Sequence, residues 1–317
     1  RIRSLINSVN PFNWIKVGRM IRKLAPDLIV VRFWLPFMGP CLGTILRIAR
    51  KNKKTRVVCI ADNIIPHERR PGDRLFTAYF IKPVDGFVVM SRSVGEDLRQ
   101  FTRTKPYIYL PHPIYDNYGE PVSRAAALQH LQLPADRHYL LFFGFLRDYK
   151  GLYLNIEALA DPRLKELPLK LIVAGEYYSN EAKYEALIEQ FGVRDQLILH
   201  TRYIPKEEVR YFFGAADLIV QPYRSATQSG ISQLAYHFEK PVLVTNVGGL
   251  PEIIEHGKVG YVVEQSPEII AASIQDYFKQ ARQLEMTRGL IENKAQFSWS
   301  HFIRGLESLH REVENFG

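Results

Sequence analysis

The sequence has few of the residues that mark several common protein classes. Its 317 residues include two cysteines, Cys41 and Cys59. They have neither zinc-ligand spacing nor the density of a disulfide-rich secreted scaffold, so we interpret them as reduced thiols in a cytoplasmic protein. No apolar run reaches the roughly 18 residues that a membrane-spanning helix needs. The nearest, residues 33–46, is interrupted by prolines and glycines.

Two kinds of binding motif are also missing. No G-x-G-x-x-G sequence follows a predicted strand, which argues against a nicotinamide-dependent dehydrogenase. No Asp-x-Asp pair and no His/Cys cluster suits a divalent ion. We therefore expect neither a metal nor another cofactor.

Positive charge is concentrated in the first part of the chain. Residues 1–120 hold 21 of the 42 lysines and arginines but 9 of the 33 acidic residues. This excess predicts an anionic or phosphate-bearing partner, although solvated helix ends explain any single cluster equally well. Nucleic acid is a weaker candidate because no recognised binding motif accompanies the basic residues. Residues 14–24 interleave apolar and basic side chains, a pattern typical of a helix at an anionic membrane surface.

Short β-branched runs alternate with helical patterns along the chain, which predicts an α/β protein with parallel sheets. The expected strands cover residues 27–32, 56–61, 86–90, 107–110, 139–143, 170–174, 197–200, 218–221, 242–245 and 260–263. Helices are expected over residues 43–52, 93–102, 152–159, 180–191, 206–214, 229–238 and 267–283. We predict a first Rossmann-like domain over residues 1–120, a second over 121–298, and a terminal helix over 299–317 that crosses back to the first. The chain has no starting Met and no opening strand, so we expect the first domain to be incomplete at its N-terminus.

Three strand exits in the second half carry residues suited to binding an anion. They read GFLRDYKG (144–151), YRSATQSG (223–230) and NVGGLPE (246–252). Glycines let a phosphate approach the backbone, and the amides at a helix start bind anions. Taken singly, each also fits an ordinary loop or a helix N-cap. Their ordered combination on one set of strands is the stronger signal.

These segments, with KPVLVTNVGGLPEII and GKVGYVV, make residues 139–316 similar to the C-terminal domain of family 4 glycosyltransferases. The first half resembles the acceptor domain of that family through APDLIVVRF, DNIIPHE and VVMSRSVGEDL. The resemblance implies the GT-B fold, in which two Rossmann-like domains with parallel sheets face a cleft. It also implies a retaining enzyme that uses a nucleotide-diphosphate sugar without a bound metal.

The resemblance further implies roles for particular residues. The donor diphosphate would be bound by Gly144, Arg147, Lys150, Gln228, Ser229 and Gly230. The base and ribose would lie near Gly175, Glu176, Tyr203 and Ile204. In the first domain, Asp62 or His67 would assist deprotonation of the acceptor or bind the donor sugar. The structural alternative is that Asp62 caps a turn and His67 lies on a mobile loop.

The sequence also departs from the family. The Glu-x7-Glu motif is absent, and its two places hold Ala226 and Leu234, as in related sequences with the SATQSG form. Phe145 stands where the family commonly has an arginine, and the nearest arginine is Arg147.

The favoured interpretation is a glycosyltransferase acting on a glycan or lipid-linked acceptor in surface polysaccharide biosynthesis. It would be a cytoplasmic enzyme, peripheral on the inner face of the membrane. The alternative is a non-catalytic descendant of the fold that binds a glycan or a protein.

Overall fold

The computed structural model describes residues 2–66, 70–178 and 181–315. Its contacts divide the chain into two compact units. The first comprises Arg1–His112 and Trp299–Gly317, and the second comprises Pro113–Ser298. The boundary therefore falls at His112, earlier than the predicted residue 120, and the last helix belongs to the first unit. None of the helices formed by the described residues combines the length and the apolar character needed to cross a bilayer.

The first unit is built on a parallel sheet with the order β1-β2-β3-β4 among its described residues. Its strands are β1 (Leu28–Phe33), β2 (Arg56–Ala61), β3 (Gly86–Val89) and β4 (Tyr107–Tyr109). Its helices are α1 (Pro11–Leu24), α2 (Gly39–Ala49), α3 (Asp73–Ile81), α4 (Arg92–Arg99) and α14 (Trp299–Asn315), with 3-10 turns η1 (Pro36–Met38) and η2 (Arg50–Asn52).

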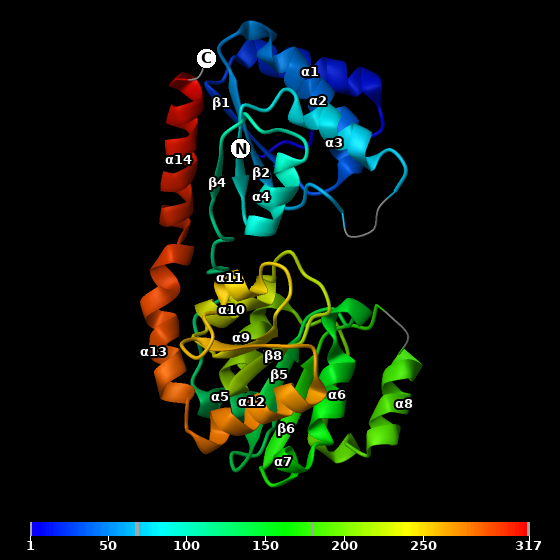
Figure 1. Ribbon diagram of the computed structural model, residues 1–317, viewed down its shortest axis with the longest axis vertical. Coiled ribbons are helices and arrows are strands. Elements are labelled where there is room, and N and C mark those ends of the chain that lie inside the picture. Colours follow the sequence, from blue (N-terminus) through cyan, green and yellow to red (C-terminus); the bar gives the residue numbers. More distant parts are fainter. Residues whose placement is uncertain (1, 67–69, 179–180, 316–317) are drawn as a thin grey trace. The chain divides into compact units, whose positions relative to one another are not determined.

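Alternate residues of β2 enter two different cores, as the period of a strand requires. Val57 and Cys59 pack with side chains of α2, α3 and α4. Val58 packs on the other face with Leu309 and Val313 of α14. Figure 1 shows α14 on one side of these strands and α1, α2 and α3 on the other. Because both faces are covered, the strands are apolar nearly throughout, as expected for a parallel sheet.

The second unit contains a larger parallel sheet with the order β10-β9-β8-β5-β6-β7. Its strands are β5 (His138–Phe143), β6 (Leu169–Ala174), β7 (Leu197–His200), β8 (Leu218–Gln221), β9 (Val242–Thr245) and β10 (Gly260–Val263). Its helices are α5 (Arg124–Leu131), α6 (Leu152–Leu159), α7 (Pro162–Lys165), α8 (Glu181–Phe191), α9 (Lys206–Ala215), α10 (Gly230–His237), α11 (Leu250–Ile253), α12 (Pro267–Lys279) and α13 (Gln283–Asn293), with 3-10 turns η3 (Asp148–Lys150), η4 (Arg194–Gln196) and η5 (Lys294–Phe297).

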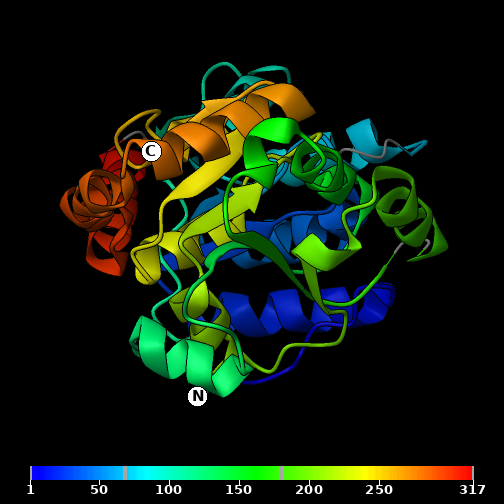
Figure 2. The ribbon, with the colours of Figure 1, turned by 90° about the horizontal axis from the view of Figure 1, so that it is seen from below.

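Strand β5 shows how this sheet is covered on both faces. Tyr139 and Leu141 pack in a core with α5, α9 and α10. Leu140 and Phe142 pack in the opposite core with α6, α8 and α12. Figure 2 shows α12, in orange, and α5, in blue-green, on opposite sides of the strands. The predicted α/β class with two parallel sheets is therefore confirmed.

The strand predictions agree with the structure to within one residue at each end, but the last helix prediction in the second unit was wrong. The helix expected over residues 267–283 ends at Lys279, and a second helix begins at Gln283. Between them Ala281 has φ of 50°, a left-handed conformation that stops a helix. Helix α3, which follows Gly72 at φ of 93°, was not among the predicted helices.

The packing of α14 leads to a stability prediction. Leu309 is buried against the first sheet, so Leu309→Ala should lower the free energy of unfolding by about 2–5 kcal/mol through lost burial and a residual cavity. Ile303→Ala on the same helix is the control, because Ile303 is half exposed and should lose less than about 1 kcal/mol. Urea unfolding measures both values. Equal losses would show that α14 does not dock as described.

Candidate functional site

The candidate site lies along one edge of the second sheet. All of its strands are parallel, so their carboxyl ends reach the same edge. The loops that leave β5, β6, β7 and β8 therefore lie next to one another there. These loops contain every residue predicted to bind the phosphates, ribose or base of a donor. Ligands of open parallel sheets gather at such an edge.

The loop after β5 places a lysine against the backbone. Gly144 has φ of 101°, and a β-carbon added there would lie 2.8 Å from the Nζ atom of Lys150. Lys150 follows in η3 and is 8% exposed. Gly151 has φ of 72° and packs so closely that an added β-carbon would lie 1.9 Å from the carbonyl oxygen of Pro222. Gly151 is therefore required by its contact with the neighbouring backbone, and Gly144 by its positive φ.

Lys150 has an unusual environment. Burial lowers the pKa of its amine to about 8, with a smaller contribution from nearby Arg147. Within the part of the chain that the structure describes, its Nζ atom has no hydrogen-bond or ion-pair partner, and it lies 5.6 Å from the ring centroid of Tyr223. A buried ammonium group without a counter-charge is unfavourable by itself. An anion bound at this edge would supply the missing charge.

The loops after β5 and β6 continue to pair beyond the strands. Leu146 donates its amide to the Glu176 carbonyl at 2.8 Å, and Tyr178 donates to the Leu146 carbonyl at 3.0 Å. Leu146 is buried, whereas Arg147 lies with its guanidinium carbon 5.0 Å from the ring centroid of Tyr178. A β-carbon on Gly175 would lie 2.3 Å from the Gly144 carbonyl oxygen. These contacts hold the two predicted segments side by side.

The loop after β8 ends in the amino terminus of α10. Ser229 is the N-cap and accepts a hydrogen bond from the Ile231 amide at 3.2 Å. Its hydroxyl donates to Oε1 of Gln221 at 3.2 Å. Ser229 is therefore occupied by capping, and Gln228 precedes it in the same loop. Gly230 is exposed, and an added β-carbon would lie 3.0 Å from the ring of Tyr115.

The third glycine-containing loop packs directly onto this one. Gly248 has φ of 51°, and a β-carbon there would lie 1.5 Å from the carbonyl oxygen of Ala226. The hydroxyl of Thr245 donates to the carbonyl of Tyr223. The amide of Arg224 donates to the carbonyl of Tyr149 at 2.7 Å, which joins the β8 loop to the β5 loop. The three predicted loops therefore form one connected structure.

The predicted base and ribose residues lie at the exits of β6 and β7. Tyr203 is exposed and Ile204 is buried, just before α9. The amide of Gly175 donates to the carbonyl of His200 at 3.0 Å, which brings the two exits together. Glu176 is partly buried beside them. The structure thus brings all four predicted residues to this end of the sheet.

Two polar residues at the same edge were missed by the sequence analysis. Nε2 of Gln221 and Nε2 of His200 are buried without a hydrogen-bond partner among the described residues. Burial also lowers the pKa of His200, helped by Arg202. Each is the last residue of its strand, and that position was the available signal. Unpaired buried polar atoms at a strand exit are suited to receive a ligand.

The residues at the two places of the missing motif have ordinary packing roles. Leu234 is buried in the core under α10. Ala226 packs against the same core, and its carbonyl is the one that Gly248 approaches. Neither position holds a carboxylate. Any acid or base chemistry must therefore use other groups.

Of the two residues predicted to be catalytic, the structure describes Asp62, which lies in the first unit. Asp62 directly follows β2, and Arg32 contacts both of its carboxylate oxygens, with Nε–Oδ2 at 2.6 Å and Nη2–Oδ1 at 2.9 Å. The two contacts with Arg32 fix the orientation of this carboxylate. His67 lies outside the described residues.

Comparisons with known proteins match most of the chain. The family model described as glycosyl transferases group 1 matches residues 123–297. A D-inositol 3-phosphate glycosyltransferase of Thermobispora bispora is 28% identical over 215 residues, which are 62% of this chain and 50% of that protein. A second, from Catenulispora acidiphila, is 26% identical over 273 residues, covering 82% of this chain and 59% of that protein. The chain thus spans about half the length of these curated relatives.

Solved structures show the same fold. Sucrose-phosphate synthase of Thermosynechococcus elongatus matches with a TM-score of 0.77 at 18% identity, over 96% of this chain and 78% of that one. Anabaena HepE in complex with UDP matches with a TM-score of 0.74 at 16% identity, over 96% and 81%. At this identity the likeness establishes the GT-B fold and nothing finer.

The buried amine of Lys150, which has no partner among the described residues, leads to a prediction about stability. Lys150→Met should raise the free energy of unfolding by about 1–3 kcal/mol at pH 7, because it removes a buried charge. The folded pKa of about 8 lies below the ordinary value of 10.5. The penalty of burying the charge is therefore fully present below pH 8 and fades between pH 8 and about 10.5.

Urea unfolding at pH 7 and at pH 10 measures this difference. Lys165→Met, at an exposed position of α7, is the control and should change little at either pH. A Lys150→Met protein that is less stable than the wild type at pH 7 would contradict the prediction.

Proposed function

Because the chain belongs to the glycosyl transferases group 1 family, we propose that it transfers a sugar from a nucleotide-diphosphate donor to an acceptor. The observation that supports this most directly is the buried Lys150 amine, which has no partner among the described residues. It lies at the carboxyl edge of the second sheet, beside the glycine-containing loops. A diphosphate placed there would neutralise it.

Three features would hold the diphosphate. Lys150 and Arg147 supply cations from the β5 loop. The exposed amide of Gly230 begins α10 and lies at the positive end of its helix dipole. Gly144 keeps the backbone close to Lys150 without a side chain in the way. Gln228 precedes this helix start, and Ser229 would act mainly by fixing the geometry of the cap.

The base and ribose would extend along the same edge toward β7. The exposed ring of Tyr203 offers a stacking surface, and Ile204 offers backbone groups. Gly175 and Glu176 line the exit between Lys150 and these residues. The donor would therefore follow the order of the strands, β5, β6 and β7.

The cations suggest how the leaving group is stabilised. When the sugar departs, negative charge develops on the nucleotide diphosphate, and in this proposal Lys150, Arg147 and the α10 dipole would stabilise that charge. We propose transfer with retention of configuration and without a bound metal, as in the family that this sequence resembles. In the first unit, Asp62 would assist deprotonation of the acceptor or bind the donor sugar, with His67 as the other candidate.

For the acceptor we propose a phosphate-bearing molecule, such as a lipid-diphosphate-linked sugar. The positive charge of residues 1–120 supports this choice. The curated relatives are named for an inositol phosphate, which also carries this group. We place the reaction in surface polysaccharide biosynthesis at the inner face of the membrane.

A second candidate function rests on Ala226 and Leu234. Because these positions hold no carboxylate, a protein that binds a nucleotide sugar or glycan without turnover is the alternative. The two differ in one observation. A transferase hydrolyses its nucleotide sugar slowly without acceptor, and a binding protein does not.

The first test is thermal stabilisation by UDP, GDP, ADP and their sugar conjugates. One nucleotide should stand out and raise Tm by several degrees at a concentration near 100 times Kd, which is worth about 2.7 kcal/mol by mass action. Lys150→Met should weaken that binding by at least about tenfold, since it removes a charge-assisted contact. Lys165→Met should bind like the wild type. A panel in which no nucleotide shifts Tm would contradict the proposed donor site.

Metal removal tests the proposed stabilisation of the leaving group. Hydrolysis or transfer of the selected nucleotide sugar should continue in excess EDTA within about twofold of the untreated rate, because protein cations supply the positive charge. Loss of activity in EDTA that Mg²⁺ or Mn²⁺ restores would show that a metal is required. Nucleotide binding measured in parallel separates a defect in binding from one in turnover.

A further inference from the structure

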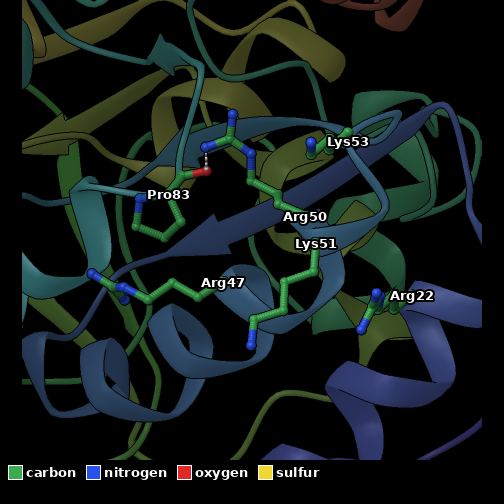
Figure 3. A pocket seen from close by; sticks show the side chains of 6 residues that line it. All are labelled: Arg22, Arg47, Arg50, Lys51, Lys53 and Pro83. Atoms are coloured by element: carbon green, nitrogen blue, oxygen red, sulfur yellow. Dashed lines mark hydrogen bonds between the residues drawn. The ribbon is translucent and has the colours of Figure 1, made fainter.

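The first unit carries a positive surface that the donor site does not use. Within residues 1–61 the sequence has one acidic residue, Asp27, which pairs with Lys54 at 2.8 Å. The fold brings the basic residues of this stretch together from separate elements. They line an open pocket of about 520 Å³ made by Arg22 of α1, Arg47 of α2, Arg50 and Lys51 of η2, Lys53, and Pro83. Figure 3 shows these side chains around the pocket.

Two of the arginines are fixed in place. Arg47 donates to the carbonyls of Gly43 at 2.8 Å and Tyr79 at 2.5 Å, and it stacks 3.6 Å from the Tyr79 ring centroid. Arg50 donates to the carbonyl of Pro83 at 3.0 Å and pairs with Asp85 at 2.6 Å. These contacts use two N–H groups of each arginine and leave three of the five donors of its guanidinium group.

The other three cations are uncompensated. Arg22, Lys51 and Lys53 are exposed, and none has an ion-pair partner among residues 2–66, 70–178 and 181–315. Asp85 is the carboxylate that pairs with Arg50, and it also accepts a hydrogen bond from the amide of Val57. The pocket is therefore strongly positive and open to an anion from solution.

This pocket lies at the wrong end of the sheet for glycosyl transfer. Lys53 precedes β2, and Pro83 precedes β3, so the pocket is at the amino ends of these strands. Asp62 lies at the carboxyl end of β2. Six residues of strand separate the two ends by roughly 20 Å. The cations of this pocket are therefore too far from Asp62 to contact the groups that react there.

The adjoining helix α1 adds exposed apolar side chains. Its inner face packs on α2, where Gly18 approaches Ile48. Its outer face forms a second hollow of about 590 Å³, lined by Phe12, Ile15, Lys16, Arg19, Met20 and Lys23. Phe12 is 84% exposed and Leu24 is 71% exposed. Helix α1 thus joins a basic pocket to a mixed basic and apolar surface.

We propose that α1 and this pocket form a docking surface for an anionic phospholipid bilayer, with a headgroup phosphate in the pocket. Lipid phosphates neutralise Arg22, Lys51 and Lys53, and Phe12 and Leu24 enter the interface between headgroups and acyl chains. This binding depends on the first unit alone and needs no nucleotide or turnover.

Two simpler explanations cover only part of the observations. Cations at the carboxyl ends of α1 and α2 complement the helix dipoles, which accounts for Arg22 and Arg47. That explanation does not require Lys53 or the exposed Phe12. A nucleic acid would use the cations and could stack a base on Phe12, but it gains little from the exposed aliphatic side chain of Leu24. The combination of both features favours a bilayer.

Co-sedimentation with vesicles tests the proposal. The wild-type protein should bind vesicles of phosphatidylcholine with phosphatidylglycerol and bind pure phosphatidylcholine at least tenfold more weakly. The triple variant Arg22→Gln, Lys51→Gln, Lys53→Gln should lose about 100-fold in binding to the anionic vesicles, about fivefold for each cation. The pair Phe12→Ser, Leu24→Ser should lose about tenfold.

The matched control replaces three exposed cations elsewhere in the same unit, Arg103→Gln, Arg304→Gln and Arg311→Gln. It has the same net charge as the triple variant and should bind the anionic vesicles within about threefold of the wild type. Equal losses in the two triple variants would overturn the proposal, because they would show a general charge effect.

Two soluble probes identify other occupants. The pocket would be assigned to free phosphates if millimolar pyrophosphate binds through Arg22, Lys51 and Lys53 and the vesicles do not bind. Single-stranded RNA that binds more tightly than vesicles, with the same dependence on these residues, would assign it to nucleic acid. Either result overturns the bilayer proposal. Nucleotides should still raise the Tm of the triple variant. This measurement distinguishes a failure of the bilayer proposal from a failure of the proposed donor site.

Discussion

The second unit depends on one constraint, the parallel alignment of its strands. In a parallel sheet every carboxyl end reaches the same edge, so loops far apart in the sequence become neighbours. The glycines make this convergence sterically feasible. The Pro222 carbonyl packs against Gly151, and the Ala226 carbonyl packs against Gly248. In both places a β-carbon would clash with the carbonyl oxygen. The anion-binding edge is thus a consequence of strand direction and of backbone contacts between loops.

At this edge the protein keeps a buried amine that it does not neutralise itself. Lys150 is held beside Gly144, and burial lowers its pKa to about 8. Such an arrangement lowers stability and is retained where function needs it. The nearby polar atoms of Gln221 and His200, buried without partners among the described residues, fit the same interpretation. These groups are already in position to interact with the negative charge of a bound ligand.

The first unit separates two functions by the direction of its strands. Asp62 stands at the carboxyl end of β2, where chemistry on an acceptor is expected, and Arg32 holds it there. The uncompensated cations stand at the amino end of the same strand. If they bind a bilayer, the protein is held by one end of the sheet while the other stays accessible. The family departures at Ala226 and Leu234 do not affect this arrangement, because both side chains serve packing in the second unit.

Strand positions and the family could be recognised in the sequence, because β-branched runs and glycine-containing loops are local signals. The predicted residues 218–221 and 242–245 are strands in the structure, and Gly144, Lys150 and Gly230 do lie at one edge. The end of α12 could not be predicted, since Ala281 adopts a left-handed conformation that its side chain does not favour. Neither the burial of Lys150 nor the Arg32–Asp62 pair is visible locally, because each depends on residues brought together from different strands and loops. The same holds for the gathering of Arg22 with Lys51 and Lys53, which only the packing of α1 on α2 produces.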